Sequence, residues 1–428
     1  MNILYVAAGI PVPGSIGGST HVTEVCRGLA ALGHNVLAIV GPSAAPRPPM
    51  LGGATALGDG ALPANATVQA PPSIGGRGAA LPGTIRIVNT PQPAALGLTL
   101  LPTIAWHAAR FRPDAVMERY YNLAGAGLIY ARATGRPSIL EVNAPLYDPP
   151  GSRKDRLDRA LGRPLRRWAR WQAQAADRIV TPLATTAGAF ARPGAIMELP
   201  WGANTDLFDP ASLDPATVAA TRAALGIPPS GRAQVVAFSG SFRPWHGVET
   251  LLAALRQLLP THPTLWALLI GDGEERAALA DQVRGWGELG RRVVFTGRLP
   301  YPDVPRHLAV ADLGVAPFEP ARHAALRHFG FYWSPLKIFE YGAMGLPTIC
   351  PALPPLDAIV RDGMEGRLYP VGDRDALAAA IGSLLDPVPG AEAARRAMGA
   401  SARARAVHEW SWAAHCRSLE AMLQCLTR

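Results

Sequence analysis

The chain has 428 residues, of which 49% are hydrophobic and 7% aromatic, and its net charge is +9. Since a domain commonly holds about 100 to 200 residues, this length predicts two domains with a core each. The basic excess favours anionic partners such as phosphates, nucleic acid or acidic lipid, without choosing among them.

The cysteine pattern and the N-terminus indicate a cytoplasmic protein. None of the four cysteines belongs to a CxxC pair, which argues against a zinc site and a disulfide scaffold. Met1 to Val6 lacks a basic region and runs directly into a strand pattern, so we expect no signal peptide. No apolar run reaches about 18 residues, and we expect no membrane-spanning helix.

The first half of the chain alternates strands with helices. Ile3 to Ala8 is an apolar run typical of a buried parallel strand, and Thr20 to Leu32 has helical periodicity. A glycine-rich loop separates them, as in a βαβ unit. Residues 43–84 are rich in Pro, Gly and Ala, which predicts a long flexible insertion. Further strands are expected at 36–40, 85–88, 115–118, 138–142, 178–181 and 196–199, and helices at 98–110 and 123–134.

The segment from Gly151 to Trp171 is strongly basic. Its Leu and Trp residues fall three or four apart, which predicts an amphipathic helix broken near Pro164. Such a helix fits a membrane surface. It fits equally a solvated helix that packs its Leu and Trp side chains on one side.

The alternation restarts after a Pro- and Ala-rich linker at 209–231. Two successive arrays of this kind predict an α/β fold with two doubly wound, Rossmann-like domains facing a cleft. The expected domains are 1–208 and 209–390, and a helical tail at 391–428 is expected to pack back on the first domain. The strands of the second array are expected at 235–239, 265–270, 293–296, 313–316 and 348–350.

The glycine loop Gly14–Ser19 is the first candidate site. Gly17 and Gly18 allow close backbone approach, and the start of the following helix offers free N–H groups to an anion. The spacing matches neither a Rossmann dinucleotide site nor a P-loop. A tight strand–helix turn is the alternative.

The second candidate site is the loop that follows the strand at 235–239. Gly240 and Ser241 are small, and Arg243 and His246 add cationic or hydrogen-bonding groups, a combination that suits a diphosphate. A helix-capping or packed histidine is the alternative for His246.

The third candidate site is the helix expected to begin at Pro335. Ser334 is placed to cap it, and the positive end of the helix together with Lys337 would face a phosphate. Glu340 lies one turn beyond Leu336, where its carboxylate could accept two ribose hydroxyls. The alternative is an ordinary amphipathic helix with Lys337 and Glu340 as a solvated i,i+3 pair.

At this helix the sequence resembles a known family. The run from Lys337 to Pro347 is similar to the signature of family 4 retaining glycosyltransferases, which have the GT-B fold. The resemblance covers nearly the whole chain apart from residues 43–84. The other segments that match in order are Gly17-Gly18, 201–208, 270–273, 297–300 and 311–313.

The resemblance implies roles for these residues. Residues 1–208 would form an acceptor-side domain and residues 209–390 the nucleotide-sugar donor domain. Glu340 would hold the ribose, and backbone near Arg298 and Leu299 would line the base. The segments 240–247 and 334–337 would hold the diphosphate, which Gly18 would approach from the other domain.

Three positions depart from the family pattern. A second glutamate usually lies eight positions before Glu340, where this chain has Tyr332. The usual Arg and Lys of the phosphate loop fall at Ser241 and His246, and we suggest that Arg243 and Lys337 compensate in charge. A histidine often follows the strand at 139–142, where this chain reads Glu141-Val142-Asn143.

We therefore predict a glycosyltransferase that moves a hexosyl-type group from a UDP- or GDP-sugar to a sugar or lipid-linked acceptor, in bacterial polysaccharide or glycolipid synthesis. Arg243, His246 and Lys337 would stabilise the leaving nucleoside diphosphate without a metal or other cofactor. The resemblance implies retention at the anomeric carbon. An anionic membrane surface is a further expected partner, with the enzyme located peripherally at the inner face of the membrane. Nucleic acid is not an expected partner.

Two other functions stay open. A nucleotide-sugar epimerase of GT-B shape would need acidic and His groups placed for proton abstraction, and no clear set is present. A non-catalytic nucleotide-sugar-binding protein is disfavoured by the retained Arg243, Lys337 and Glu340. Asp373-Arg374-Asp375 matches the DxD pattern of metal–nucleotide sites, but its place at a helix start predicts a cap instead.

Overall fold

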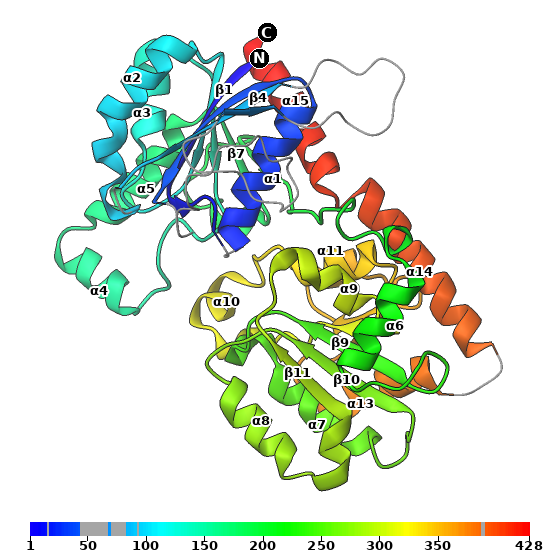
Figure 1. Ribbon diagram of the computed structural model, residues 1–428. Helices are drawn as coiled ribbons and strands as arrows, with labels where there is room; N and C mark the ends of the chain where they lie inside the picture. Colours follow the sequence, from blue (N-terminus) through cyan, green and yellow to red (C-terminus); the bar gives the residue numbers. More distant parts are fainter. Residues whose placement is uncertain (15–16, 43–66, 70–82, 92–93, 387–389) are drawn as a thin grey trace. The chain divides into compact units, whose positions relative to one another are not determined.

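The chain folds into two compact units, seen in the computed structural model (Figure 1). It describes residues 1–14, 17–42, 67–69, 83–91, 94–386 and 390–428. The N-terminal unit contains Met1–Trp201, Tyr332–Ser334 and Trp412–Arg428, and the C-terminal unit contains Gly202–Phe331 and Pro335–Ser411. Each unit is a mainly parallel sheet with helices, as the alternation of apolar runs predicts.

The N-terminal unit is built on an eight-stranded sheet. Its strands are β1 (Asn2–Pro11), β2 (Asn35–Gly41), β3 (Thr67–Gln69), β4 (Thr84–Asn89), β5 (Ala115–Arg119), β6 (Ser138–Glu141), β7 (Arg178–Thr181) and β8 (Ile196–Glu198). Their order is β3-β4-β2-β1-β5-β6-β7-β8, and β3 alone of these runs antiparallel to its neighbour. The central strands are apolar on both faces because helices cover both.

The helices of this unit include the end of the chain. They are α1 (Gly17–Ala31), α2 (Leu101–Phe111), α3 (Ala126–Thr134), α4 (Arg153–Ala160), α5 (Pro164–Ala175) and α15 (Trp412–Thr427), with 3₁₀ turns η1 (Ala94–Leu100) and η2 (Ala184–Thr186). Helix α15 packs on α1 closely, since a Cβ on Gly28 would lie 2.3 Å from Sγ of Cys416. The last part of the tail therefore belongs to the N-terminal unit.

The C-terminal unit is built on a six-stranded parallel sheet. Its strands are β9 (Gln234–Ser239), β10 (Leu265–Ile270), β11 (Val293–Gly297), β12 (Leu313–Val315), β13 (Thr348–Pro351) and β14 (Gly366–Tyr369). The order is β11-β10-β9-β12-β13-β14. The chain thus adds strands on one side of β9 and then crosses to the other side. The switch point, where ligands of doubly wound sheets bind, lies between β9 and β12.

Nine α-helices belong to the described part of the C-terminal unit. They are α6 (Pro215–Ala224), α7 (Val248–Leu258), α8 (Arg276–Arg284), α9 (Val304–Leu308), α10 (Ala324–Phe329), α11 (Leu336–Ala343), α12 (Leu356–Ile359), α13 (Arg374–Leu385) and α14 (Ala391–His408). The 3₁₀ turns are η3 (Pro210–Ser212), η4 (Pro244–His246), η5 (Gly287–Arg292), η6 (Tyr301–Asp303) and η7 (Pro320–Arg322). Apolar side chains of α7 and α13 pack on the sheet to form the core of this unit.

Two local expectations need correction. Within the predicted insertion 43–84, residues 67–69 form β3, a strand whose Thr and Val favour extended backbone; the rest of that segment up to residue 82 lies outside the described residues. Strand β14 was not expected, because its Gly-Arg-Leu-Tyr sequence lacks an apolar run. Residues 15 and 16 of the first glycine loop also lie outside the described residues.

The basic segment 151–171 is interrupted before Pro164, as predicted, into α4 and α5. The prediction that its Leu and Trp side chains form one apolar face holds for α5 only. Trp168 and Trp171 of α5 stack on each other 4.4 Å apart, but Leu157 and Leu161 are 60% and 67% exposed. Helix α4 buries no residue. Among the described residues, no helix has both the length and the apolar composition needed to cross a membrane.

Candidate functional site

The loops at the carboxyl ends of β9, β10 and β11 are joined to one another by backbone hydrogen bonds. The N–H of Gly240 donates to Ile270 O at 2.9 Å, and the N–H of Gly271 donates to Gly297 O at 3.1 Å. A Cβ on Gly271 would lie 1.9 Å from Gly240 O, and its φ of +135° also favours glycine. Glycine is therefore required where these loops meet beside the switch point.

Lys337, in the first turn of α11, places its ammonium at this switch point. Its side chain is 8% exposed, and Nζ has no hydrogen-bond partner among the described residues. Nζ lies 3.9 Å from the ring centroid of Phe238 at the end of β9 and 5.0 Å from that of Phe318 after β12. A Cβ on Gly240 would lie 2.8 Å from Nζ. Burial lowers the pKa of Lys337 to about 7.

Glu340, one turn further along α11, is 6% exposed. The hydroxyl of Tyr301 donates to its Oε1 at 3.0 Å. Burial raises the pKa of Glu340 to about 7, against the hydrogen bond from Tyr301 and the charge of Lys337, which both lower it. The alternative of a solvated pair formed by Lys337 and Glu340 is wrong, because both side chains are buried.

The phosphate-loop candidates follow β9. Nδ1 of His246 lies 2.5 Å from Ser241 O and 3.2 Å from Ser241 Oγ. Burial, together with the nearby charges of Lys337 and Arg243, lowers the pKa of His246 to about 3. His246 was predicted to act as a cation or as a hydrogen-bonding group. At neutral pH its imidazole is uncharged, which suits hydrogen bonding. Arg243 is exposed and lies 3.5 Å from Glu274.

The start of α11 differs from the expectation in one respect. Ser334 does not cap the helix: Pro335 occupies the N-cap position without a side-chain bond, and Leu336 is the first helical residue. Ser334 Oγ instead accepts a hydrogen bond of 2.9 Å from the N–H of Trp201, within the N-terminal unit. Because proline directly precedes the helix, the serine lies one residue too early to act as its cap.

The remaining candidates lie at loop or helix starts. Arg298 is exposed and Leu299 half-buried, directly after β11. Gly17 and Gly18 are the first two residues of α1 in the N-terminal unit. Their predicted roles toward base and phosphates stay predictions.

The segment Glu141-Val142-Asn143, which departs from the family pattern, takes part in a buried polar cluster in the N-terminal unit. Glu141 accepts hydrogen bonds from Tyr5 and Asn143, and Nη1 of Arg119 donates to its Oε1 at 2.8 Å. Asn143 in turn accepts a bond of 2.7 Å from the indole N–H of Trp201. The Glu141 carboxylate is thus the centre of a polar network at the carboxyl end of β6.

The DxD match is a helix cap, as predicted. Asp373 accepts hydrogen bonds from the backbone N–H groups of Asp375 and Ala376 at the start of α13. These bonds orient the first carboxylate toward the helix.

Sequence reasoning missed the aromatic residues of the site. Phe238 and Phe318 flank the Lys337 ammonium, and Tyr301 reaches Glu340 from a separate loop. No local pattern marks them, since an aromatic residue at a strand end ordinarily indicates core packing. The only signal was the position of Tyr301 directly after Arg298-Leu299-Pro300.

Together these groups have the chemistry to bind an anion joined to a polyhydroxyl group. A buried ammonium beside a helix start, with no hydrogen-bond partner in the described part of the chain, suits phosphate oxygens, and a buried carboxylate suits hydroxyl donors. A nucleoside diphosphate presents both, with phosphates and ribose in series.

Two family profiles match the chain. That of "Glycosyltransferase Family 4" matches residues 16–206, and that of "Glycosyl transferases group 1" matches residues 233–387. The first covers most of the N-terminal unit and the second most of the C-terminal unit.

Characterised relatives match about half of the chain. A GDP-mannose-dependent alpha-(1-6)-phosphatidylinositol monomannoside mannosyltransferase of Mycolicibacterium smegmatis is 31% identical over 53% of this chain and 55% of that protein. A D-inositol 3-phosphate glycosyltransferase of Acidothermus cellulolyticus is 31% identical over 54% of this chain and 50% of that protein. The chain thus spans about half the length of the curated relatives it matches.

Solved structures resemble the whole chain. HepE of Anabaena, in complex with UDP, aligns with a TM-score of 0.66 at 18% identity and covers 100% of both chains. Sucrose-phosphate synthase of Thermosynechococcus elongatus aligns with a TM-score of 0.69 at 20% identity, over 99% of this chain and 98% of that one. At such identities the likeness concerns the fold.

Proposed function

We propose that this chain, which belongs to glycosyltransferase family 4 and has the two-domain GT-B fold, transfers a glycosyl group from a nucleoside-diphosphate sugar to an acceptor hydroxyl. The observation that carries the proposal is the Lys337 ammonium, buried at the switch point without a hydrogen-bond partner among the described residues. A buried cation is stable when an anion occupies the site. The diphosphate of the donor supplies that anion.

The donor binds along α11. Glu340 accepts hydrogen bonds from the ribose, and the backbone at Arg298 and Leu299 lines the base. The phosphates lie against Gly240 and Lys337, where the absence of a Cβ at Gly240 leaves room beside Nζ. His246, held by Ser241, contributes as a neutral hydrogen-bonding group.

The reaction breaks the bond between the anomeric carbon and the diphosphate oxygen and forms a bond from that carbon to the acceptor oxygen, whose proton is released. The nucleoside diphosphate leaves with the electron pair, and Lys337 stabilises the negative charge that develops on it. Arg243 adds a second, exposed cation. We propose that these cations make a divalent metal unnecessary and that, as in the retaining enzymes the sequence resembles, configuration at the anomeric carbon is retained.

The acceptor is proposed by analogy with the relatives. The Mycolicibacterium relative is named for a phosphatidylinositol mannoside acceptor and a GDP-mannose donor. A lipid-linked acceptor would bring the enzyme to a membrane, and α4 offers a surface for this. Leu157 and Leu161 are exposed one turn apart, with Arg153, Lys154 and Arg156 exposed beside them.

A donor panel tests the proposed function. We expect one UDP- or GDP-sugar to be consumed only when an acceptor from a lipid or sugar panel is present, with equal rates in EDTA and in Mg²⁺. Glu340→Ala should weaken binding of the matching nucleotide by about 1.5 to 3 kcal/mol in calorimetry, the range of charge-assisted hydrogen bonds. Glu392→Ala, at an exposed carboxylate of α14, should leave binding unchanged.

Three results would contradict the proposal. Isomerised donor in the absence of acceptor would support an epimerase. Tight nucleotide binding without turnover across the whole acceptor panel would support a binding protein. Unchanged affinity in Glu340→Ala would remove the ribose assignment.

A further inference from the structure

Tyr301 connects two parts of the proposed donor site. It is the first residue of η6 and follows Arg298-Leu299-Pro300, the loop assigned to the base. Its hydroxyl donates to Oε1 of Glu340 at 3.0 Å, across 39 residues of sequence. Its ring packs against the fully buried Phe208, with centroids 5.4 Å apart and planes inclined by 54°. Both ends of the side chain are thereby held.

The hydrogen bond restricts the Glu340 carboxylate. The terminal torsion of a glutamate is soft and roughly two-fold, so an unheld carboxylate samples several orientations. With Oε1 bound to Tyr301, the plane of the carboxylate is set. Oε2 and the second acceptor position of Oε1 then remain for hydroxyl donors. Two adjacent ribose hydroxyls require such a pair of acceptors in a defined plane.

A neutral donor is suited to this task. An arginine or lysine at position 301 would also orient the carboxylate, but as a stronger ion-pair partner it would compete with the ribose hydroxyls. A phenol donates one hydrogen bond to the carboxylate and adds no charge. Burial raises the pKa of Glu340, and the hydrogen bond from Tyr301 lowers it. The bond therefore favours the ionised carboxylate, in which both oxygens accept hydrogen bonds and neither donates.

We propose that Tyr301 is a positioning residue that orients Glu340 toward both ribose hydroxyls and thereby sets the preference for ribose over 2′-deoxyribose in the donor. The inference rests on the proposed function, in which Glu340 holds the ribose. Because Tyr301 directly follows the base loop, base and ribose recognition share one segment of backbone. Tyr301 does not touch the reacting atoms, so its loss should affect binding more than chemistry.

The test compares UDP and GDP with dUDP and dGDP in calorimetry. We expect the native chain to bind its preferred ribonucleotide about tenfold or more tightly than the deoxy form, the scale of a hydrogen bond to a charged group. In Tyr301→Phe the affinity for the ribonucleotide should fall about tenfold while that for the deoxy form changes little, so the preference largely disappears. With the donor sugar, KM should rise and kcat should be retained.

Tyr369→Phe is the matched control. Tyr369 is buried in the same unit, and its hydroxyl has no hydrogen-bond partner in the described ranges, so its removal should leave the preference intact. Thermal unfolding of both variants separates misfolding from lost selectivity. A folding defect would weaken the binding of the ribonucleotide and of the deoxy form equally.

The outcomes separate the two proposals. An unchanged ribose preference in a folded Tyr301→Phe, together with weakened binding in Glu340→Ala, would overturn the role of Tyr301 alone. A native chain that binds none of the four nucleotides would overturn the proposed function and this inference with it.

Discussion

At the residue scale, the burial of the Lys337 ammonium is the feature that most directly indicates a ligand. Removing an ammonium from water without a hydrogen-bonding partner costs free energy, and the contacts with Phe238 and Phe318 return only part of it. The native chain carries this cost in its ligand-free form. Since stability and function compete at such sites, we propose that a bound anion offsets this cost.

Lys337→Met should therefore stabilise the free protein and impair the enzyme. Burial lowers the pKa of Lys337 from its ordinary value to about 7, so the unfolded chain binds the proton more tightly. The destabilisation of the folded state by the buried Lys337 charge is greatest below about pH 7. It decreases as the pH rises toward the pKa of about 10.4 that lysine has in the unfolded chain. We expect a higher melting temperature in the variant, by about 2 to 4 °C for each kcal/mol gained, and more at pH 6.5 than at pH 9.

The same variant should lower kcat by about 10² or more, the effect of one electrostatic group at a leaving oxygen. Lys154 is the chain's other lysine and is exposed, so Lys154→Met provides a matched control without effect on the melting temperature. With lysine-selective ¹³C labelling, two side-chain resonances follow the titrations directly. A Lys337 resonance that titrates near its ordinary pKa and ignores added nucleotide would refute the assignment.

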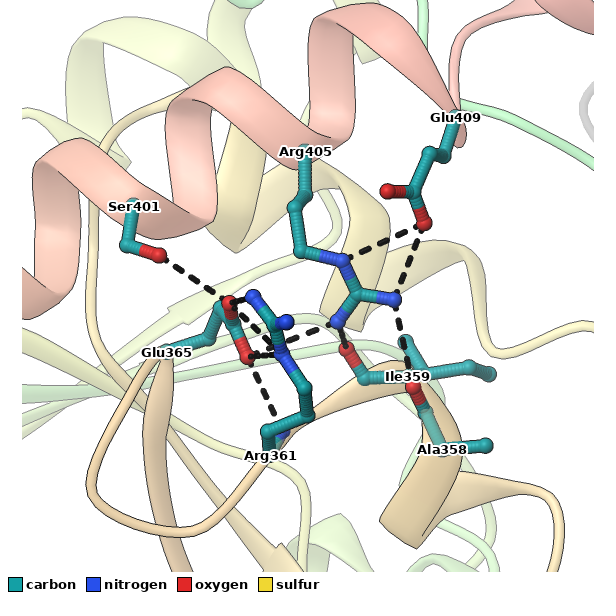
Figure 2. Close-up of polar contacts among 7 residues, drawn as sticks. All are labelled: Ala358, Ile359, Arg361, Glu365, Ser401, Arg405 and Glu409. Carbon is teal, nitrogen blue, oxygen red and sulfur yellow. Dashed lines mark hydrogen bonds and ion pairs between the residues drawn. The ribbon is translucent and has the colours of Figure 1, made fainter.

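At the scale of elements, the position of α11 depends on α14, which packs against it within the C-terminal unit. A Cβ on Gly399 of α14 would lie 2.1 Å from Gly345 O, so the two backbones are in direct contact there. Figure 2 shows the polar network that anchors α14 to the turn between α12 and β14. Glu365 accepts bonds from Arg361, Ser401 and Arg405, and Arg405 also donates to Ile359 O at 2.9 Å.

Glu365→Gln should destabilise the protein by about 3 kcal/mol, because it removes the charge that balances two arginines at a buried carboxylate. Burial alone would raise the pKa of Glu365, but the bonds from Arg361 and Ser401 and the charge of Arg405 outweigh it and lower the pKa to about 2. The contribution is therefore present above the unfolded pKa of about 4.3 and is lost as the pH falls toward 2.

Urea unfolding at pH 7 and pH 3 measures this effect. The difference between the native chain and Glu365→Gln should shrink at the lower pH. Glu392→Gln removes an exposed i,i+4 partner of Arg396 on the same helix and should cost less than about 0.5 kcal/mol. Equal effects of the two substitutions would mean that the network in Figure 2 does not anchor the helix.

At the scale of the whole molecule, α4, α5 and the turn between them contribute exposed basic side chains to the net charge of +9. Seven basic side chains of segment 151–171 are exposed, as are Leu157 and Leu161: Arg153, Lys154, Arg156, Arg159, Arg163, Arg167 and Arg170. Each basic residue near an anionic bilayer contributes about 1 kcal/mol, and the leucines add burial of apolar surface. Both terms favour an anionic membrane.

Sedimentation with vesicles tests this surface. We expect pelleting with phosphatidylglycerol-containing vesicles and little with pure phosphatidylcholine. Replacing Arg153 and Lys154 by Ser, or Leu157 and Leu161 by Ser, should weaken vesicle binding about tenfold or more. Arg284→Ser, an exposed arginine of the C-terminal unit, is the control. Equal pelleting with both lipids, or none with either, would end the proposal of a membrane surface.

Much of the architecture was predictable from the sequence. The apolar runs at Ile3–Ala8 and Leu265–Ile270 correspond to β1 and β10, and the run from Lys337 to Pro347 correctly indicated family 4. Buried parallel strands are recognisable because they are apolar on both faces. Strand β14 was missed because its side chains do not form a continuous apolar run.

The sequence by itself determined the α/β class, the order of most elements and the helix that carries Lys337 and Glu340, because periodicity and glycine spacing act over a few residues. Only the tertiary structure decided the environment of those two groups. It buried both, brought Phe238 and Phe318 to the ammonium and Tyr301 to the carboxylate, and directed Ser334 to Trp201. These contacts join residues far apart in the chain, and the pKa of an ionisable group depends on its burial and neighbours, which no local pattern records.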